Sequence, residues 1–242
     1  MLPDVHYFYF FDNVDFPYGN KENKFLIQRA EKILSEISNK YWLSLVVIAC
    51  NTVSTVALSS LRAKFKFPIV GVVPAIKRAA ELTRNGIIGL LATPTTISQS
   101  YTHKLIAQFA SKSRILMFGS LELVILAEKK LQNLPISLEK LQNILPTWLI
   151  KDHHPDIIVL GCTHFQFLTK ELYHILPRGI QILDSSVAVA RQINLLLRHR
   201  PLQKIIKSTN TAFCIDFTNN YEQKFLVLQR YGFKILEPLL LK

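Results

Sequence analysis

Two cysteines stand in similar surroundings in different halves of the sequence. One lies in Val46-Val47-Ile48-Ala49-Cys50-Asn51-Thr52, and the other lies in Ile158-Val159-Leu160-Gly161-Cys162-Thr163-His164. In both runs an apolar strand leads to a small residue, a cysteine and polar side chains, and a helix is expected to follow. The cysteines are 112 positions apart (162 minus 50), so each half of the chain carries one.

This arrangement suggests acid–base chemistry by thiols. A cysteine between a strand and a helix lies near the helix N-terminus, where unpaired N–H groups favour an anion. We therefore expect both thiols to have a pKa below the usual value of about 8.5. Two thiols on opposite sides of one ligand would invert a stereocentre, because one removes a proton and the other returns one.

The third cysteine, Cys214 in Phe213-Cys214-Ile215, is predicted to be a small buried hydrophobic residue, as a lone cysteine after a strand usually is. An odd and sparse set of three cysteines is not a disulfide framework. No clustered Cys/His spacing indicates zinc, so no metal is expected.

These residues must be positioned by alternating strands and helices. Apolar runs of strand length predict strands at 6–11, 44–49, 69–72, 87–91, 114–118, 156–160, 181–183 and 212–215. Amphipathic stretches predict helices at 22–38, 55–64, 75–83, 95–110, 121–131, 138–150 and 187–198. Continuous runs such as Leu45-Val46-Val47-Ile48 are typical of strands buried on both faces of a parallel sheet. The pattern predicts a doubly wound α/β fold, with Val73-Pro74 and Leu183-Asp184 as candidate crossings between domains.

Composition narrows the class of protein. The chain has 242 residues, 49% of them hydrophobic and 19% charged, which indicates a globular protein with a sizeable core. No apolar run reaches the ~18 residues needed to cross a bilayer, and no signal peptide is evident, so we expect a soluble intracellular protein. The net charge of +12 comes from dispersed basic residues. A nucleic-acid partner is therefore the least favoured interpretation.

At the two cysteines the sequence resembles the glutamate racemase family, in Ala49-Cys50-Asn51-Thr52 and Gly161-Cys162-Thr163-His164. Four further segments resemble motifs of that family and follow in its order. They are Phe16-Pro17-Tyr18-Gly19, Gly71-Val72-Val73-Pro74-Ala75, Leu91-Ala92-Thr93-Pro94-Thr95-Thr96 and Leu183-Asp184-Ser185. Together the motifs run from about residue 7 to about residue 216.

The resemblance implies two pseudo-symmetric lobes, each a mainly parallel sheet flanked by helices. The first lobe would comprise residues 1–74 and 185–242, and the second would comprise residues 75–184. The lobes would close on free glutamate without pyridoxal phosphate or metal. The product, D-glutamate, would serve peptidoglycan synthesis in the bacterial cytoplasm. A homodimer is also an expectation from the resemblance, while no membrane partner is expected.

The resemblance also assigns roles to residues. Cys50 and Cys162 would be the two acid/base groups, with His164 as the partner of Cys162. Glu128 fits the family glutamate that assists the second thiol, although a solvated helix face is the alternative interpretation. The expected substrate-binding residues are Pro17, Tyr18, Gly19, Asn51, Thr52, Thr93, Thr95, Thr96 and Thr163.

One departure from the family concerns the start of the chain. Family members open with a strand and an Asp-Ser-Gly turn, which no segment here matches. We therefore expect the first-lobe sheet to lack a strand, through either a start assigned too late or a decayed homologue. An omitted interior strand leaves backbone groups unpaired and apolar surface bare, at several kcal/mol by order of magnitude.

Three alternatives to glutamate racemisation stay open. One is another enzyme of the same superfamily, such as an aspartate racemase or a one-thiol decarboxylase. Thr163-His164 favours glutamate over aspartate as substrate, by resemblance. The second is a non-catalytic homologue that binds an anionic ligand or a protein. The third is the nucleic-acid binder already disfavoured by the dispersed charges.

Overall fold

The computed structural model describes residues 5–149, 154–198, 209–216 and 221–241. Every strand pairing within these residues is parallel. The strands are β1 (Phe8–Phe11), β2 (Val46–Ile48), β3 (Ile69–Gly71), β4 (Ile87–Ala92), β5 (Arg114–Gly119), β6 (Ile157–Gly161), β7 (Gln181–Leu183), β8 (Thr211–Cys214) and β9 (Ile235–Pro238). The α-helices are α1 (Asn23–Lys40), α2 (Asn51–Lys64), α3 (Ile76–Leu82), α4 (Pro94–Ser98), α5 (Ser100–Phe109), α6 (Glu122–Leu131), α7 (Leu138–Ile144), α8 (Thr169–Ile175), α9 (Ser186–Leu197) and α10 (Tyr221–Arg230). Short 3-10 helices are η1 (Tyr18–Asn20), η2 (Thr147–Leu149) and η3 (Thr163–Leu168).

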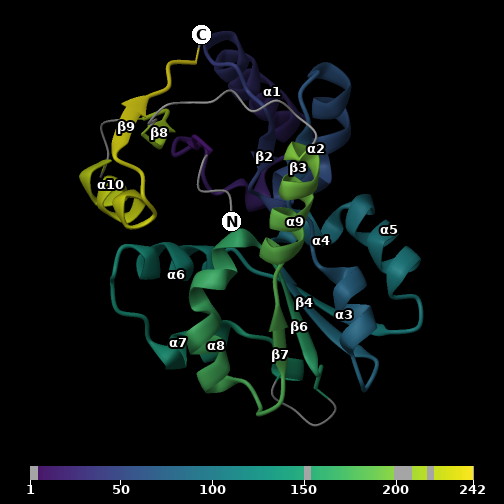
Figure 1. Ribbon diagram of the computed structural model, residues 1–242. Coiled ribbons are helices and arrows are strands. Elements are labelled where there is room, and N and C mark those ends of the chain that lie inside the picture. The colour runs from purple at the N-terminus through teal and green to yellow at the C-terminus, as the bar shows by residue number, and fades with distance from the viewer. Residues whose placement is uncertain (1–4, 150–153, 199–208, 217–220, 242) are drawn as a thin grey trace.

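One half of the molecule is built on a four-stranded sheet in the order β5-β4-β6-β7. Helices α3 and α5 lie on one side of this sheet, and α6, α7 and α8 lie on the other (Figure 1). Every residue of β6 is buried, as the predicted continuous apolar run requires. Alternate β6 residues enter different cores: Ile158 and Leu160 pack with α6 and α8, while Ile157 and Val159 pack with α3. This sheet therefore provides a rigid support for Cys162, the residue after β6.

The remaining strands do not form one sheet. The order β1-β8-β9 makes a three-stranded sheet, and β2 pairs with β3 in a separate two-stranded sheet. The prediction that Leu45-Val46-Val47-Ile48 is buried on both faces is wrong, because all four residues are only partly buried. One edge of β2 has no strand beside it among the described residues, and the residues of β2 line a cavity instead of a packed core.

Several helix boundaries differ from the predicted ones. The expected helix 95–110 is two helices, α4 and α5, because Gln99 between them has an extended backbone with ψ 135°. The expected helix 138–150 ends at Ile144, since Leu145 precedes Pro146 and is extended. Helix α2 begins at Asn51 rather than at residue 55, directly after Cys50. Helices α8 and α10 and strand β9 were not predicted.

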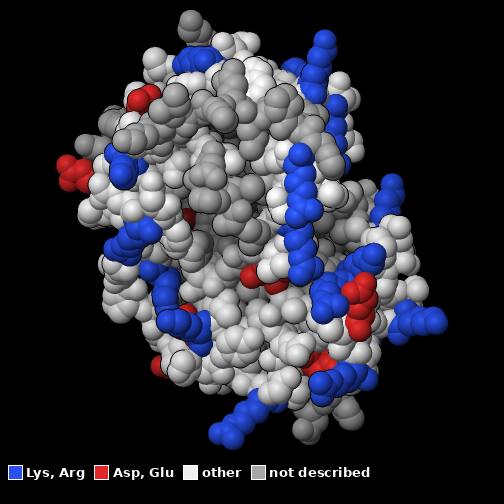
Figure 2. All heavy atoms as spheres, viewed as in Figure 1, with Lys and Arg blue, Asp and Glu red and all other residues white. Residues whose placement is uncertain are grey.

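Two observations concern the surface. On the face in Figure 2, the Lys and Arg side chains lie over several separate elements, with Asp and Glu among them. In the described part of the chain, no helix combines the length and the apolar character needed to cross a bilayer.

The division into residues 1–74 with 185–242 and residues 75–184 stays a prediction.

Candidate functional site

The two cysteines occupy equivalent places at the ends of strands. Cys50 follows β2 and caps the N-terminus of α2, while Cys162 follows β6 and caps η3. Both have extended backbone, with φ −148° and −139°, which turns the chain from strand to helix. Both also line a single cavity of about 790 Å³. The predicted convergence of the two thiols on one cavity is therefore present in the structure.

Contacts between the two halves hold the cysteine motifs together. The hydroxyl of Thr163 donates to the carbonyl of Ala49 at 3.3 Å, so the residue after Cys162 binds the residue before Cys50. A second junction is a buried hydroxyl triangle in which Thr52 lies 2.9 Å from Thr93 and 3.2 Å from Thr96. Thr93 and Thr96 are themselves 2.9 Å apart. These hydroxyl contacts fix α2 against the start of α4.

The expectation of lowered thiol pKa values is wrong. Burial raises the pKa of Cys50, although N–H groups of Val53 and Thr52 and the Thr52 hydroxyl act in the opposite direction. Burial likewise raises the pKa of Cys162 to about 12, against hydrogen bonds from the N–H groups of His164 and Phe165. The helix ends do stabilise the thiolates, as expected, but the loss of hydration is the larger effect.

His164 and Glu128 form a pair beside Cys162. The imidazole Nε2 of His164 lies 2.8 Å from Oε1 of Glu128, and both side chains line the cavity. The ring of Phe16 lies over this histidine, with ring centroids 5.4 Å apart. Glu128 therefore has a specific partner in the cavity, which argues against the alternative of a simple solvated helix face.

The loop around η1 crosses between the two halves. Tyr18 and Gly19 line the cavity, and the carbonyl of Gly19 accepts a hydrogen bond of 2.8 Å from Thr95. A Cβ at Gly19 would lie 2.7 Å from Cβ of Thr93, so the close approach of this loop to α4 requires glycine.

Most of the predicted site residues line the cavity, while two do not. Those in the lining are Pro17, Tyr18, Gly19, Cys50, Asn51, Thr52, Thr93, Glu128, Cys162, Thr163 and His164. Thr96 is fully buried behind Thr52 and Thr93, and Thr95 points to the η1 loop. The structure places these two where they support other residues of the site.

Asn51 has an unused hydrogen-bonding atom. Its side chain is only 3% exposed, and its Oδ1 has no hydrogen-bond partner. Buried polar atoms are normally paired, and each exception calls for an explanation. Because Asn51 lines the cavity beside Cys50, a ligand that donates a hydrogen bond would explain this one.

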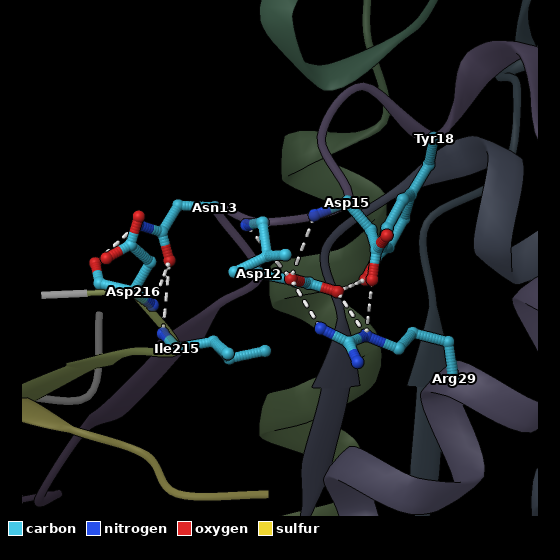
Figure 3. A network of polar contacts seen from close by, with 8 residues as sticks. Asp12, Asn13, Asp15, Tyr18, Arg29, Ile215 and Asp216 are labelled. Atoms are coloured by element: carbon cyan, nitrogen blue, oxygen red, sulfur yellow. Dashed lines mark hydrogen bonds and ion pairs between the residues drawn. The ribbon is translucent and has the colours of Figure 1, made fainter. Parts of the chain in front are cut away.

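A polar network beneath the η1 loop was not predicted from the sequence (Figure 3). Asp12 follows β1 and accepts hydrogen bonds from Nε of Arg29 at 2.6 Å and from the Tyr18 hydroxyl at 2.5 Å. Arg29 also lies 3.0 Å from Asp15. Burial acts to raise the pKa of Asp12, but the hydrogen bonds from Arg29 and Tyr18 outweigh it and lower that pKa. The sequence feature that could have predicted this network is the polar pair Asp12-Asn13 at the end of an apolar strand.

The neighbouring Asn13 closes the other side of this turn. Its amide nitrogen donates to the carbonyl of Asp216 at 2.6 Å, and its oxygen accepts from the backbone N–H of Ile215 and Asp216 (Figure 3). The turn after β1 is thus fixed to α1 by Asp12 and to the end of β8 by Asn13. Within the described residues, no group of three or more His, Cys, Asp or Glu side chains is arranged to hold a metal ion.

Comparisons with known proteins agree with this geometry. The Asp/Glu/Hydantoin racemase family matches residues 1–193. A glutamate racemase of Escherichia fergusonii is 53% identical over 239 residues, which are 99% of this chain and 84% of that protein. A glutamate racemase of Salmonella typhimurium is 52% identical with the same coverage.

A solved structure extends the likeness to the fold. The crystal structure of Escherichia coli glutamate racemase, in complex with L-glutamate and the activator UDP-MurNAc-Ala, superposes with a TM-score of 0.95 at 51% identity. The match covers 100% of this chain and 91% of that one. This likeness confirms the predicted α/β fold with two lobes. The site geometry, the match over residues 1–193 and the identities above together show that the chain belongs to the Asp/Glu/Hydantoin racemase family.

Proposed function

We propose that this chain interconverts L- and D-glutamate by proton transfer between two thiols, without a cofactor. The observation that carries the proposal is the placement of Cys50 and Cys162, from different halves of the molecule, on one cavity. The 53% identity to a glutamate racemase supports glutamate as the substrate, and so does the similar structure that holds L-glutamate. The relatives and the similar structure described above are glutamate racemases, so they favour glutamate over the alternatives of an aspartate racemase or a decarboxylase.

The reaction assigns a thiolate and a thiol to opposite faces of the substrate. One sulfur takes the α-proton of glutamate, and the other thiol donates its proton to the opposite face of Cα. The two thiols exchange protonation states in each turnover, so the reverse reaction uses the same groups. His164, which lies 2.8 Å from Glu128, would exchange a proton with Cys162.

The polar end of the cavity offers groups for an amino acid. Oδ1 of Asn51 has an unused acceptor suited to the substrate ammonium. The hydroxyls of Thr52, Thr93 and Thr163 would donate to a carboxylate on giving up their present partners, the other hydroxyls of the triangle and the carbonyl of Ala49. Backbone N–H groups at the start of α2 and η3 would stabilise negative charge that develops on the substrate in the transition state. Thr95 and Thr96 would hold the η1 loop and the hydroxyl triangle in place.

The proposal also covers the role of the product, the boundaries of the lobes and the assembly of the protein. The D-glutamate would supply peptidoglycan synthesis, and the enzyme would act in the bacterial cytoplasm. The lobes would have the predicted boundaries, residues 1–74 with 185–242 and residues 75–184. A homodimer is the expected assembly.

The test is incubation with L-glutamate in heavy water. Proton NMR should record loss of the α-proton signal, and circular dichroism should record approach to the racemic mixture. Cys50→Ala and Cys162→Ala should each reduce racemisation by at least about 10³-fold, because one face of the substrate loses its acid or base. Cys214→Ala is the matched control, since Cys214 lies buried in β8 and outside the cavity lining. Full activity in either of the first two variants would reject the two-thiol scheme.

A further inference from the structure

The side chain of Phe16 packs on the imidazole of His164. The two ring centroids are 5.4 Å apart, and the rings are inclined by 39° to each other. A separation of roughly 4.5–7 Å is usual for packed aromatic rings. Both side chains line the cavity. Phe16 therefore contacts a residue of the proposed proton transfer, although the mechanism described above gives it no role.

The two rings come from different parts of the chain. Phe16 is in the loop between β1 and η1. His164 is in η3 and its partner Glu128 is in α6, and both of these elements belong to the half built on the four-stranded sheet. The imidazole is therefore restrained by a residue from outside its own half of the molecule.

The loop that carries Phe16 is itself held in place on both sides of this residue (Figure 3). Before it, Oδ1 of Asp12 accepts hydrogen bonds from the N–H groups of Val14 at 3.2 Å and Asp15 at 3.3 Å. After it, the hydroxyl of Tyr18 donates to Oδ2 of Asp12 at 2.5 Å. A side chain on a fixed segment loses little further freedom when it packs, so Phe16 is suited to restrain a neighbour.

The imidazole of His164 has to present two nitrogens in different directions. Its Nε2 lies 2.8 Å from Oε1 of Glu128, and the described residues offer its ring no other hydrogen bond. Nδ1 is thus the nitrogen left for proton exchange with Cys162. A half-turn about the Cβ–Cγ bond would put carbon atoms in the places of both nitrogens. The proton exchange consequently needs one of the two ring orientations.

Phe16 hinders this half-turn. A ring that turns about its Cβ–Cγ bond sweeps its edges through the space above its own face. At His164 the ring of Phe16 occupies that space on one side. Closely packed atoms leave no room for such a sweep unless the neighbour moves away first.

We propose that Phe16 is a positioning residue for the second thiol, because its ring holds the imidazole of His164 with Nε2 at Glu128 and Nδ1 left for proton exchange. This proposal rests on the proposed racemisation and adds one residue to it. Phe16 has no group that accepts or donates a proton, so its effect on the reaction must pass through His164.

The kinetic test compares glutamate racemisation by the wild-type chain, Phe16→Ala, His164→Asn and the double variant. Phe16→Ala should lower kcat about three- to tenfold and change KM less than about twofold, because the ring acts on proton transfer and not on substrate binding. In the His164→Asn background the same change should lower kcat less than about twofold, since the residue through which Phe16 acts is gone.

Two further variants separate positioning of the imidazole from the structure of the loop. Phe16→Tyr keeps the aromatic ring and should keep kcat within about twofold of the wild-type value. Val14→Ala is the matched control in the same loop, because Val14 is 55% exposed and lies outside the cavity lining. It should leave both kcat and KM unchanged.

NMR of the chain with isotope-labelled histidine tests the ring contact without substrate. The ring protons of His164 are assigned by their absence from the spectrum of His164→Asn. They should shift in Phe16→Ala, because they lose the ring current of the neighbouring aromatic group, and they should stay in place in Val14→Ala.

Three results with an active wild-type chain would overturn this proposal and leave the racemisation standing. They are unchanged His164 resonances in Phe16→Ala, a wild-type kcat in that variant, and an equal loss of kcat with and without His164. The last result would mean that Phe16 acts on the substrate or on the fold. A wild-type chain that does not racemise glutamate would instead reject the proposed function, and the role of Phe16 with it.

Discussion

Cys50 and Cys162 hold their protons more tightly than a free cysteine, because burial raises the pKa of both thiols. Catalysis needs one of them as thiolate, and the thiolate fraction grows with pH below the pKa. We expect kcat/KM for glutamate to rise between pH 6 and pH 9, by up to about tenfold per unit. Initial rates across this range test the expectation, with Cys214→Ala showing the same profile. A flat profile from pH 6 would contradict it.

Replacing Asn51 should weaken substrate binding without lowering the stability of the fold. Its Oδ1 has no partner, so Asn51→Ala removes a buried unsatisfied group and should leave the free energy of unfolding unchanged or higher. The same change should raise KM for glutamate about tenfold, which corresponds to one lost hydrogen bond to a charged group. Urea unfolding and steady-state kinetics measure the two effects.

Ser54 is the matched control on the same helix. It is buried, donates to the carbonyl of Ile48 at 3.1 Å and accepts from the N–H of Val72 at 3.1 Å. Ser54→Ala should lower stability by about 1–3 kcal/mol and leave KM unchanged. A loss of stability in Asn51→Ala as large as in Ser54→Ala would show that Asn51 is a structural residue.

At the scale of elements, the turn between β1 and α1 positions the η1 loop. Asp12 is 4% exposed at its side chain and binds Arg29 and Tyr18 together. Arg29→Met would leave this carboxylate without its cation, at a cost of about 2–4 kcal/mol for a largely buried pair. Arg29→Lys should restore part of the stability. KM should rise in the methionine variant with a smaller change in kcat, because the loop carrying Tyr18 loses its support.

The exposed ion pair of Lys64 and Glu31 is the control for the buried pair of Arg29 and Asp12. Lys64 lies 2.8 Å from Glu31 with half of its side chain exposed, so Lys64→Met should cost less than about 1 kcal/mol and leave KM unaltered. Equal stability losses in Arg29→Met and Lys64→Met would refute a structural role for the network.

The sequence predicted elements where local pattern and tertiary environment agree. The apolar run before Cys162 became a fully buried strand, and the polar residues after both cysteines reached one cavity. Cys214 is buried as expected. The break at Gln99 was not predictable from periodicity, because one extended residue between two amphipathic helices hardly alters the pattern.

Other features depend on contacts that no local pattern encodes. The raised thiol pKa values follow from burial, which a motif does not report. The Asp12–Arg29 pair joins residues on different elements. Strand β2 has an apolar sequence like that of β6, yet its residues are only partly buried, whereas those of β6 are buried. The difference comes from neighbouring strands, because β6 is paired on both edges and β2, among the described residues, on one.

Across the whole molecule, the two halves differ in how completely their strands are paired. The sheet of β4 and β6 is covered on both faces, while β1 and β2 border a cavity. Amide exchange at residues 157–161 should therefore be at least about 100-fold slower than at residues 46–48 under native conditions. Hydrogen-exchange mass spectrometry on the intact chain measures both segments. Equal rates would mean that the chain opens as one cooperative unit.

The pairing of β1 with β8 has a consequence for synthesis of the protein. Phe8 is the register partner of Thr211, and His6 and Asn13 each bind residues 203 positions later. A ribosome adding ~5–20 residues per second needs roughly 10–40 s to make that intervening chain. During that time the aromatic segment Phe8–Phe11 lacks its partner strand, so we expect it to bind chaperones that hold nascent apolar strands.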